Sequence, residues 1–155
     1  MIKHCKIRGF EPLTSCPGAR IPEQATANSA GYDFFAAETV TIKPMAQTEF
    51  KPTLVATGIK AYMREDERLE ILARSSLGKL GLQLSNCVGL VDADYYNNIG
   101  NEGHIFFAFW NHSIFPVTLN KGDKIGQGVF SKFLYADSRQ STAVRKGGYG
   151  STDKD

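Results

Sequence analysis

The sequence has no long apolar run, and this limits the kind of protein it can encode. Every stretch of consecutive apolar residues falls well short of the roughly 18–20 residues that cross a bilayer as a helix. The N-terminal segment, MIKHCKIRGF, also lacks the apolar core of a signal peptide. We therefore expect a soluble chain without a membrane partner, located in the cytoplasm or, in a eukaryote, also in the nucleus.

Disulfide and metal-binding patterns are missing as well. The chain has 3 cysteines and no C-x-x-C pair, so we expect a reduced protein without a disulfide framework. Its 3 histidines are scattered and match no zinc-site spacing, which favours ordinary loop or partly buried histidines. These residues are Cys5, Cys16, Cys87, His4, His104 and His112.

Charge of one sign is not concentrated anywhere. The 155 residues suit one domain, and the formal net charge is only +2. No run of lysine or arginine forms a nucleic-acid-binding arm, so we expect no nucleic acid partner. A small anionic substrate stays open, because it would need only a few local cations.

Sustained helical periodicity is nearly absent, and short β-rich runs between Gly, Pro, Asn and Asp take its place. Such runs predict an all-β fold, namely a sandwich, a barrel or a jelly roll. No long linker or repeat divides the chain. The expected strands lie at residues 39–43, 53–62, 68–73, 104–110, 117–119 and 124–134.

Residues 75–81 interrupt the β pattern. They begin with Ser75 and Ser76, contain Leu77 and Leu80, and end at Gly81. This predicts a short helix with a serine N-cap and a glycine stop, whose free N–H groups would favour phosphate. A structural turn between strands is the alternative.

The segment 145–152 combines Arg145 and Lys146 with three glycines, an aromatic ring and two hydroxyls. Its backbone N–H groups, cations and hydroxyls suit a polyphosphate, and Tyr149 suits stacking on a base. The alternative is a disordered chain end.

Taken together, five motifs resemble those of the homotrimeric deoxyuridine triphosphatase family, in the family's order. The resemblance implies a jelly-roll-like, distorted β-barrel in residues 1–144, with at most one short helix and a flexible C-terminal arm at 145–155. It also implies a homotrimer with shared active sites. The motifs lie at residues 30–33, 74–77, 86–95, 122–127 and 147–152.

The family's reaction is hydrolysis of dUTP to dUMP and pyrophosphate, which limits uracil in DNA and supplies dUMP for dTMP synthesis. Water is a poor nucleophile, so a carboxylate must take its proton, and the resemblance assigns this role to Asp92. Asp94 would order the water. Without the resemblance, such a pair of acids would be a solvated turn or a metal-ligand pair.

The third motif would also recognise the nucleoside. The resemblance places the ring of Tyr95 against the sugar, where a 2′-hydroxyl has no room. Asn86 and the backbone of Gly89 would meet the uracil edge, and a site built for one base leaves polar groups unpaired with another. A core or interface tyrosine is the alternative reading of Tyr95.

The remaining motifs would hold the triphosphate. Ser75, the backbone of Ser76 and Gln127 would bind phosphates, with Arg74 supporting the site. The cofactor would be Mg²⁺, held mainly by phosphates and water, so no carboxylate cage is expected. Asp33 would contact the water shell of the metal or buttress the site. The arm would close over the substrate through Arg145, Tyr149, Gly150, Ser151 and Thr152.

Three departures from the family pattern stand out. Ser76 replaces a glycine of the second motif, and Tyr149 follows Arg145 by four residues where the family has an aromatic at five. The shorter spacing leaves open whether Arg145 or Lys146 reaches the γ-phosphate. Residues 96–103 form a longer connection than usual, which we interpret as a surface hairpin insertion.

Two other functions compete with this one. In the related dCTP deaminases, a glutamate activates water and protonates the leaving amine, but here Ala108 falls at that position and Lys79 replaces an arginine. A non-enzymatic regulator is the second alternative, with residues 96–103 as its candidate surface. The carboxylate of Asp92 favours hydrolysis over both.

Overall fold

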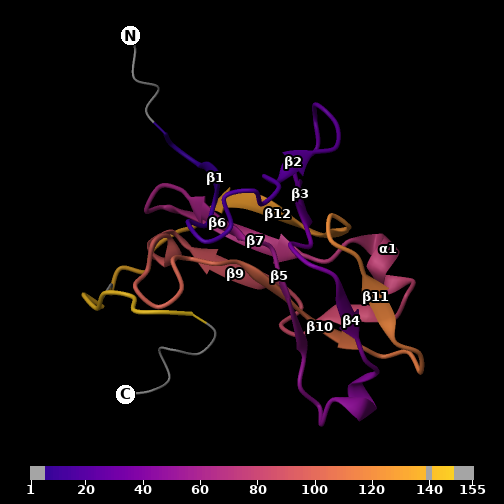
Figure 1. The fold of residues 1–155 in the computed structure, drawn as a ribbon. Coiled ribbons are helices and arrows are strands. Elements are labelled where there is room, and N and C mark those ends of the chain that lie inside the picture. Colours follow the sequence, from indigo (N-terminus) through magenta and orange to yellow (C-terminus); the bar gives the residue numbers. More distant parts are fainter. Residues whose placement is uncertain (1–5, 139–140, 149–155) are drawn as a thin grey trace.

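The computed structural model describes residues 6–138 and 141–148. Strands dominate these residues, with one four-residue helix, α1 (Ser75–Gly78), and two single turns of 3-10 helix, η1 (Met45–Gln47) and η2 (Ala93–Tyr95) (Figure 1). This confirms the all-β prediction with one short helix. The strands are β1 (Gly9–Pro12), β2 (Glu23–Gln24), β3 (Tyr32–Phe35), β4 (Val40–Ile42), β5 (Thr53–Ala56), β6 (Ile59–Tyr62), β7 (Glu67–Leu72), β8 (Leu82–Leu84), β9 (Gly89–Asp92), β10 (Phe106–Asn111), β11 (Val117–Leu119) and β12 (Lys124–Lys132).

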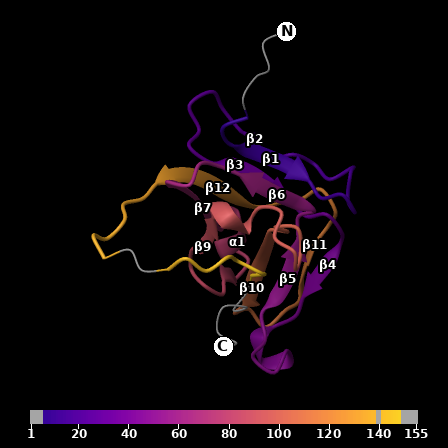
Figure 2. The same cartoon turned by 90° about the vertical axis from the view of Figure 1, so that its left-hand side faces the viewer.

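All strand pairs in the described residues are antiparallel, and they do not close into one barrel. The largest sheet has the order β2-β3-β12-β7-β9, and a second sheet has the order β5-β10-β8. The pairs β1-β6 and β11-β4 complete the strand pairing of the described chain (Figure 2). Non-consecutive neighbours such as β12 and β7 bring distant motifs together. In the part of the chain that the structure describes, no helix is long and apolar enough to cross a membrane.

The core forms because strand side chains alternate between faces. In β7, Leu69 and Ile71 point inward and are buried, while Arg68 and Glu70 point outward and are partly exposed. Leu69 joins a buried cluster with Phe34 of β3, Phe107 of β10 and Ile125 of β12. Burial of each such side chain contributes roughly 1.5–3 kcal/mol, so this cluster fixes the strands that carry the motifs.

Three local predictions were wrong. The single strand expected at 53–62 is two strands, because Gly58 has φ +69° and turns the chain between β5 and β6. The N-cap of α1 is Arg74 rather than a serine, and no side chain caps the helix, although Gly81 follows it at φ +80°. Residues 96–103 form successive turns and no hairpin, since neither half of the segment is a strand.

Candidate active site

Strand β7 separates the predicted site residues into two groups. At its beginning, Arg68 pairs with Asp92 of β9, and at its end, Leu72 pairs with Gln127 of β12. Four residues along a strand correspond to roughly 13 Å. The helix α1 and the described end of the C-terminal segment accordingly lie at opposite ends of the largest sheet (Figure 1). We call one group the β9 pocket, which contains Asn86, Gly89, Asp92, Tyr95 and Arg145. We call the other group the α1 cluster, which contains Asp33, Arg74, Ser75, Ser76 and Gln127.

The β9 pocket is a cavity of about 190 Å³ beside strand β9. Asp92 ends this strand and precedes η2, so the local chain direction changes just after its carboxylate. Its side chain remains 44% exposed, which leaves it accessible to water. The predicted residues that line the cavity are Asn86, Gly89, Asp92, Tyr95 and Arg145.

Tyr95 forms a fixed wall of the β9 pocket. The residue is 7% exposed, and its hydroxyl donates to the His104 carbonyl at 2.8 Å and accepts from Asn101 Nδ2 at 2.7 Å. Burial raises the pKa of the Tyr95 phenol, which stays neutral. A Cβ atom on Gly148 would lie 2.5 Å from the Tyr95 ring, so only glycine permits this close approach.

Arg145 connects the C-terminal segment to both acids of the third motif. Its Nη2 atom contacts Asp92 Oδ2, and its Nε donates to Asp94 Oδ1 at 2.7 Å. The guanidinium carbon lies 6.0 Å from the centre of the Tyr95 ring. In this arrangement Arg145 faces the carboxylates of its own chain, and its contact to Asp92 is made through Oδ2.

The α1 cluster is organised around Asp33, which is 6% exposed. Arg74 Nε lies 3.6 Å from Asp33 Oδ1, and Lys124 Nζ lies 2.8 Å from Oδ2. The Lys124 contact lacks hydrogen-bond geometry, so Oδ2 is a buried oxygen without a hydrogen-bond partner among the described residues. Arg74 thus pairs with Asp33, and its supporting role at the site stays a prediction.

The other members of the α1 cluster are more open. Ser75 and Ser76 are exposed on the first turn of α1. Gln127 pairs with Asp33 across β3 and β12, and its side chain lies over Gly31, where a Cβ atom would come within 2.3 Å of Gln127 Oε1. The first, second and fourth motifs therefore meet here, on a surface that one chain leaves accessible.

A metal site needs several donor side chains close together. No group of three or more His, Cys, Asp or Glu side chains within residues 6–138 and 141–148 could hold a metal ion. Mg²⁺ usually keeps several waters and binds through one or two carboxylates and substrate phosphates. Oδ2 of Asp33 pairs with Lys124 but makes no hydrogen bond, so it could still accept one from such a water.

Several residues at the site were not predicted from the sequence. His104 supplies the carbonyl that fixes Tyr95, and its Nε2 accepts from the Gly58 amide at 3.0 Å. Asn101 holds the same tyrosine hydroxyl, and Lys124 pairs with Asp33. A polar residue close after the tyrosine was the available signal for Asn101. Tyr149, Gly150, Ser151 and Thr152 lie outside the described residues.

The family model described as dUTPase matches residues 18–153. The chain belongs to the dUTPase family. It is 48% identical to the deoxyuridine 5′-triphosphate nucleotidohydrolase of Lactococcus lactis subsp. lactis over 152 residues, which cover 95% of this chain and 98% of that protein. A dUTPase crystal structure from Streptococcus mutans has a TM-score of 0.75 at 41% identity, covering 84% of this chain and 99% of the other.

The fold also extends to a more distant dUTPase. The dUTPase of phage phi11 of S. aureus has a TM-score of 0.68 at 21% identity, over 88% of this chain and 96% of that one. These matches confirm the resemblance that the five motifs indicate. Within the β9 pocket, Ala108 of β10 lines the cavity beside Asn86. The methyl group of Ala108 cannot move protons, which argues against deamination at this position.

Proposed function

We propose that this protein hydrolyses dUTP to dUMP and pyrophosphate, and so limits uracil in DNA and supplies dUMP for dTMP synthesis. The relatives in Lactococcus lactis and Wolinella succinogenes are named deoxyuridine 5′-triphosphate nucleotidohydrolases. The observation that carries the proposal is the position of Asp92, at the edge of a cavity that Tyr95 and Asn86 also line.

In the proposed reaction, a water oxygen attacks the α-phosphorus and Asp92 accepts the water's proton. A bond forms between that oxygen and the α-phosphorus, while the bond from the α-phosphorus to the oxygen bridging the β-phosphate breaks. The bridging oxygen keeps the electron pair and leaves with pyrophosphate. Asp94 orders the water. A positioned base of this kind contributes about 10²–10⁴-fold to the rate.

The nucleoside is selected in the β9 pocket. Asn86 and the Gly89 backbone bind the uracil edge, and the ring of Tyr95 occupies the space that a 2′-hydroxyl would need. Asn86, Gly89 and Tyr95 line the cavity together with apolar side chains from β7, β8 and β10, which exclude water around the base. Unpaired polar groups would then disfavour cytosine.

The phosphates bind at the α1 cluster, through Ser75, the Ser76 backbone and Gln127, with Arg74 held by Asp33. Asp33 would hold a water of the Mg²⁺ shell. When bound, Mg²⁺ neutralises phosphate charge and orients the triphosphate. A phage phi11 dUTPase mutant is described with a structural Mg(II) ion. The arm closes over the substrate with Arg145, Tyr149, Gly150, Ser151 and Thr152. On closure, Arg145 leaves Asp92 and binds a phosphate instead.

The active protein is a homotrimer with shared sites, in which residues 1–144 form the β domain and 145–155 the arm. The support is the separation of the β9 pocket from the α1 cluster along β7, since Asp92 and Gln127 pair with opposite ends of that strand. One chain does not bring its own Asp92 together with the phosphate ligands of its α1 cluster. A neighbouring chain would supply the missing half.

An assay of pyrophosphate release from dUTP, dCTP, dTTP and UTP, with ammonia measured in parallel, tests the function. We expect pyrophosphate from dUTP in strong preference to the others, and no ammonia from dCTP. Ammonia release would support deamination, and no turnover of any nucleotide would support a binding protein.

A further inference from the structure

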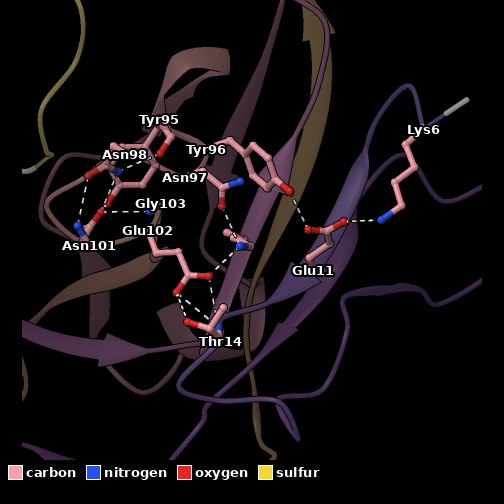
Figure 3. Close-up of polar contacts among 11 residues, drawn as sticks. Lys6, Glu11, Thr14, Tyr95, Tyr96, Asn97, Asn98, Asn101, Glu102 and Gly103 are labelled. Atoms are coloured by element: carbon pink, nitrogen blue, oxygen red, sulfur yellow. Dashed lines mark hydrogen bonds and ion pairs between the residues drawn. The ribbon is translucent and has the colours of Figure 1, made fainter.

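The turns at residues 96–103 follow directly on Tyr95 and are tied to the protein at both ends. Asn97, Glu102 and Gly103 have φ values of 54°, 61° and 86°, so the chain reverses direction within a few residues. Its Asn97 amide donates to the Glu102 carbonyl at 3.1 Å, which closes the loop. Figure 3 shows the side chains of this segment turned toward Tyr95 on one side and toward Thr14 on the other.

The outer side of the loop is anchored by Glu102. Its carboxylate accepts from Lys60 Nζ at 2.6 Å and from Thr14 Oγ1 at 2.8 Å. These hydrogen bonds, with Lys60 as the larger cause, lower the pKa of Glu102 to about 2. The ion pair therefore persists at neutral pH. Lys60 is nearly buried on β6 and also donates to Asn97 Oδ1 at 2.7 Å, so it holds both ends of the loop.

The inner side of the loop is organised by two asparagines. Asn98 is 7% exposed, and its Nδ2 donates to the Tyr95 carbonyl at 2.8 Å and to Asn101 Oδ1 at 2.8 Å. Its Oδ1 accepts from the Asn101 amide at 3.1 Å. This places Asn101 Nδ2 2.7 Å from the Tyr95 hydroxyl, which in turn donates to the His104 carbonyl (Figure 3).

We propose that Asn101, oriented by Asn98, is a positioning residue that fixes the Tyr95 ring and thereby sets discrimination between deoxyribose and ribose. The inference rests on the proposed function. A donor on one side of the hydroxyl and an acceptor on the other hold the ring against both swing and tilt. Rejection of a hydroxyl by shape requires that the ring does not yield, and a displacement of about 1 Å is enough to change turnover strongly.

The sharpest test is Asn101→Asp. Aspartate has nearly the same size and keeps an Oδ1 acceptor for Asn98 and for the Gly103 amide. It replaces the Nδ2 donor by an oxygen, so the single hydroxyl proton of Tyr95 can serve either the His104 carbonyl or the new carboxylate, and one of the two contacts that fix the ring is lost. We expect the ratio of kcat/KM for dUTP to kcat/KM for UTP to fall about tenfold or more. Ile99→Ser is the matched control, because Ile99 belongs to the same loop and is 90% exposed. Its ratio should equal that of the unmodified protein.

A second variant keeps the proposal testable if Asn101→Asp does not fold. Tyr95→Phe retains the ring and removes the hydroxyl, so it should lower the dUTP/UTP ratio to a similar extent. In a Tyr95→Phe background, Asn101→Asp should lower the dUTP/UTP ratio only a little further, because both changes act on the same contact. Thermal melting of each variant separates this from global unfolding.

The outcomes are distinct. An unchanged dUTP/UTP ratio in a folded Asn101→Asp protein overturns the inference, as does an unchanged ratio in Tyr95→Phe. If the effects of Asn101→Asp and Tyr95→Phe on the dUTP/UTP ratio are fully additive, the inference is also overturned, since Asn101 would then act independently of the Tyr95 hydroxyl. Failure of the unmodified protein to hydrolyse dUTP refutes the proposed function itself.

Discussion

The β9 pocket and the α1 cluster differ in how completely one chain builds them. Tyr95 in the β9 pocket is buried and its hydroxyl is hydrogen-bonded on both sides. Ser75 and Ser76 in the α1 cluster are exposed, and only Asp33 there is buried. A rigid pocket suits recognition of a base and sugar by shape. An open group of donors suits a flexible triphosphate that a second chain helps to enclose.

The comparison predicts its largest effect at Asp92. Asp92→Asn keeps the size of the side chain but cannot take a proton from water, so kcat for dUTP should fall by at least about 10²-fold. Binding of a non-hydrolysable dUTP analogue should be retained, as measured by calorimetry. Asp137→Asn is the control, because it removes the same charge from an exposed position. Turnover close to normal in a folded Asp92→Asn protein would remove Asp92 from the mechanism.

Mixing two inactive chains tests whether the two halves of a site come from different copies. One chain carries Asp92→Asn, and the other carries Ser75→Ala with Gln127→Ala. If a site combines the β9 pocket of one chain with the α1 cluster of another, random exchange should restore about a quarter of the sites. Activity is measured after unfolding and refolding the mixture, with each variant refolded alone as control. No recovery despite mixed trimers in native mass spectrometry would mean that each chain forms its own site.

A smaller effect is expected at Gly31 in the α1 cluster. A Cβ atom there would lie 2.3 Å from Gln127 Oε1, so Gly31→Ala should turn the Gln127 side chain away from the phosphates. Loss of one hydrogen bond to a charged group corresponds to about a tenfold rise in KM for dUTP, with a smaller change in kcat. Gly18→Ala is the matched control, because a Cβ atom on Gly18 meets no other atom within 4 Å. A fall in kcat with KM unchanged would place Gln127 in the chemical step.

The sequence predicted the all-β class and the position of the helix because these depend on local composition. It did not predict that Asp92 and Gln127 pair with opposite ends of β7, since strand register is set by packing between distant segments. The break at Gly58 was missed because the apolar pattern continues through it. The segment 96–103 was wrongly expected to be a surface hairpin, because its hydrogen bonds to Tyr95 and Thr14 cannot be read from a polar sequence.

The smallest expected effect is a pH dependence of stability at the back of the β9 pocket. Burial lowers the pKa of His104 below its usual 6.5, against a weaker opposing effect of Glu102. The neutral ring is required, because Nε2 accepts from the Gly58 amide at 3.0 Å. The imidazole of His104 takes up a proton more readily in the unfolded chain than in the folded one. The free energy of unfolding should therefore be highest above pH 6.5 and should decrease as the pH falls below that value.

Urea unfolding at a series of pH values from about 7.5 down to about 5.5 measures how the free energy of unfolding depends on pH. This dependence should be weaker in His104→Gln, because a glutamine side chain does not titrate in that range. Glu102 stays ionised across that range, since its pKa is about 2, so the anchor of the 96–103 loop should hold while the His104 contact weakens. His112→Gln is the control for histidine loss. If the free energy of unfolding changes equally with pH in the unmodified protein and in His104→Gln, the Gly58–His104 contact does not contribute to this pH dependence. The β9 pocket would then be supported by the loop at residues 96–103 alone.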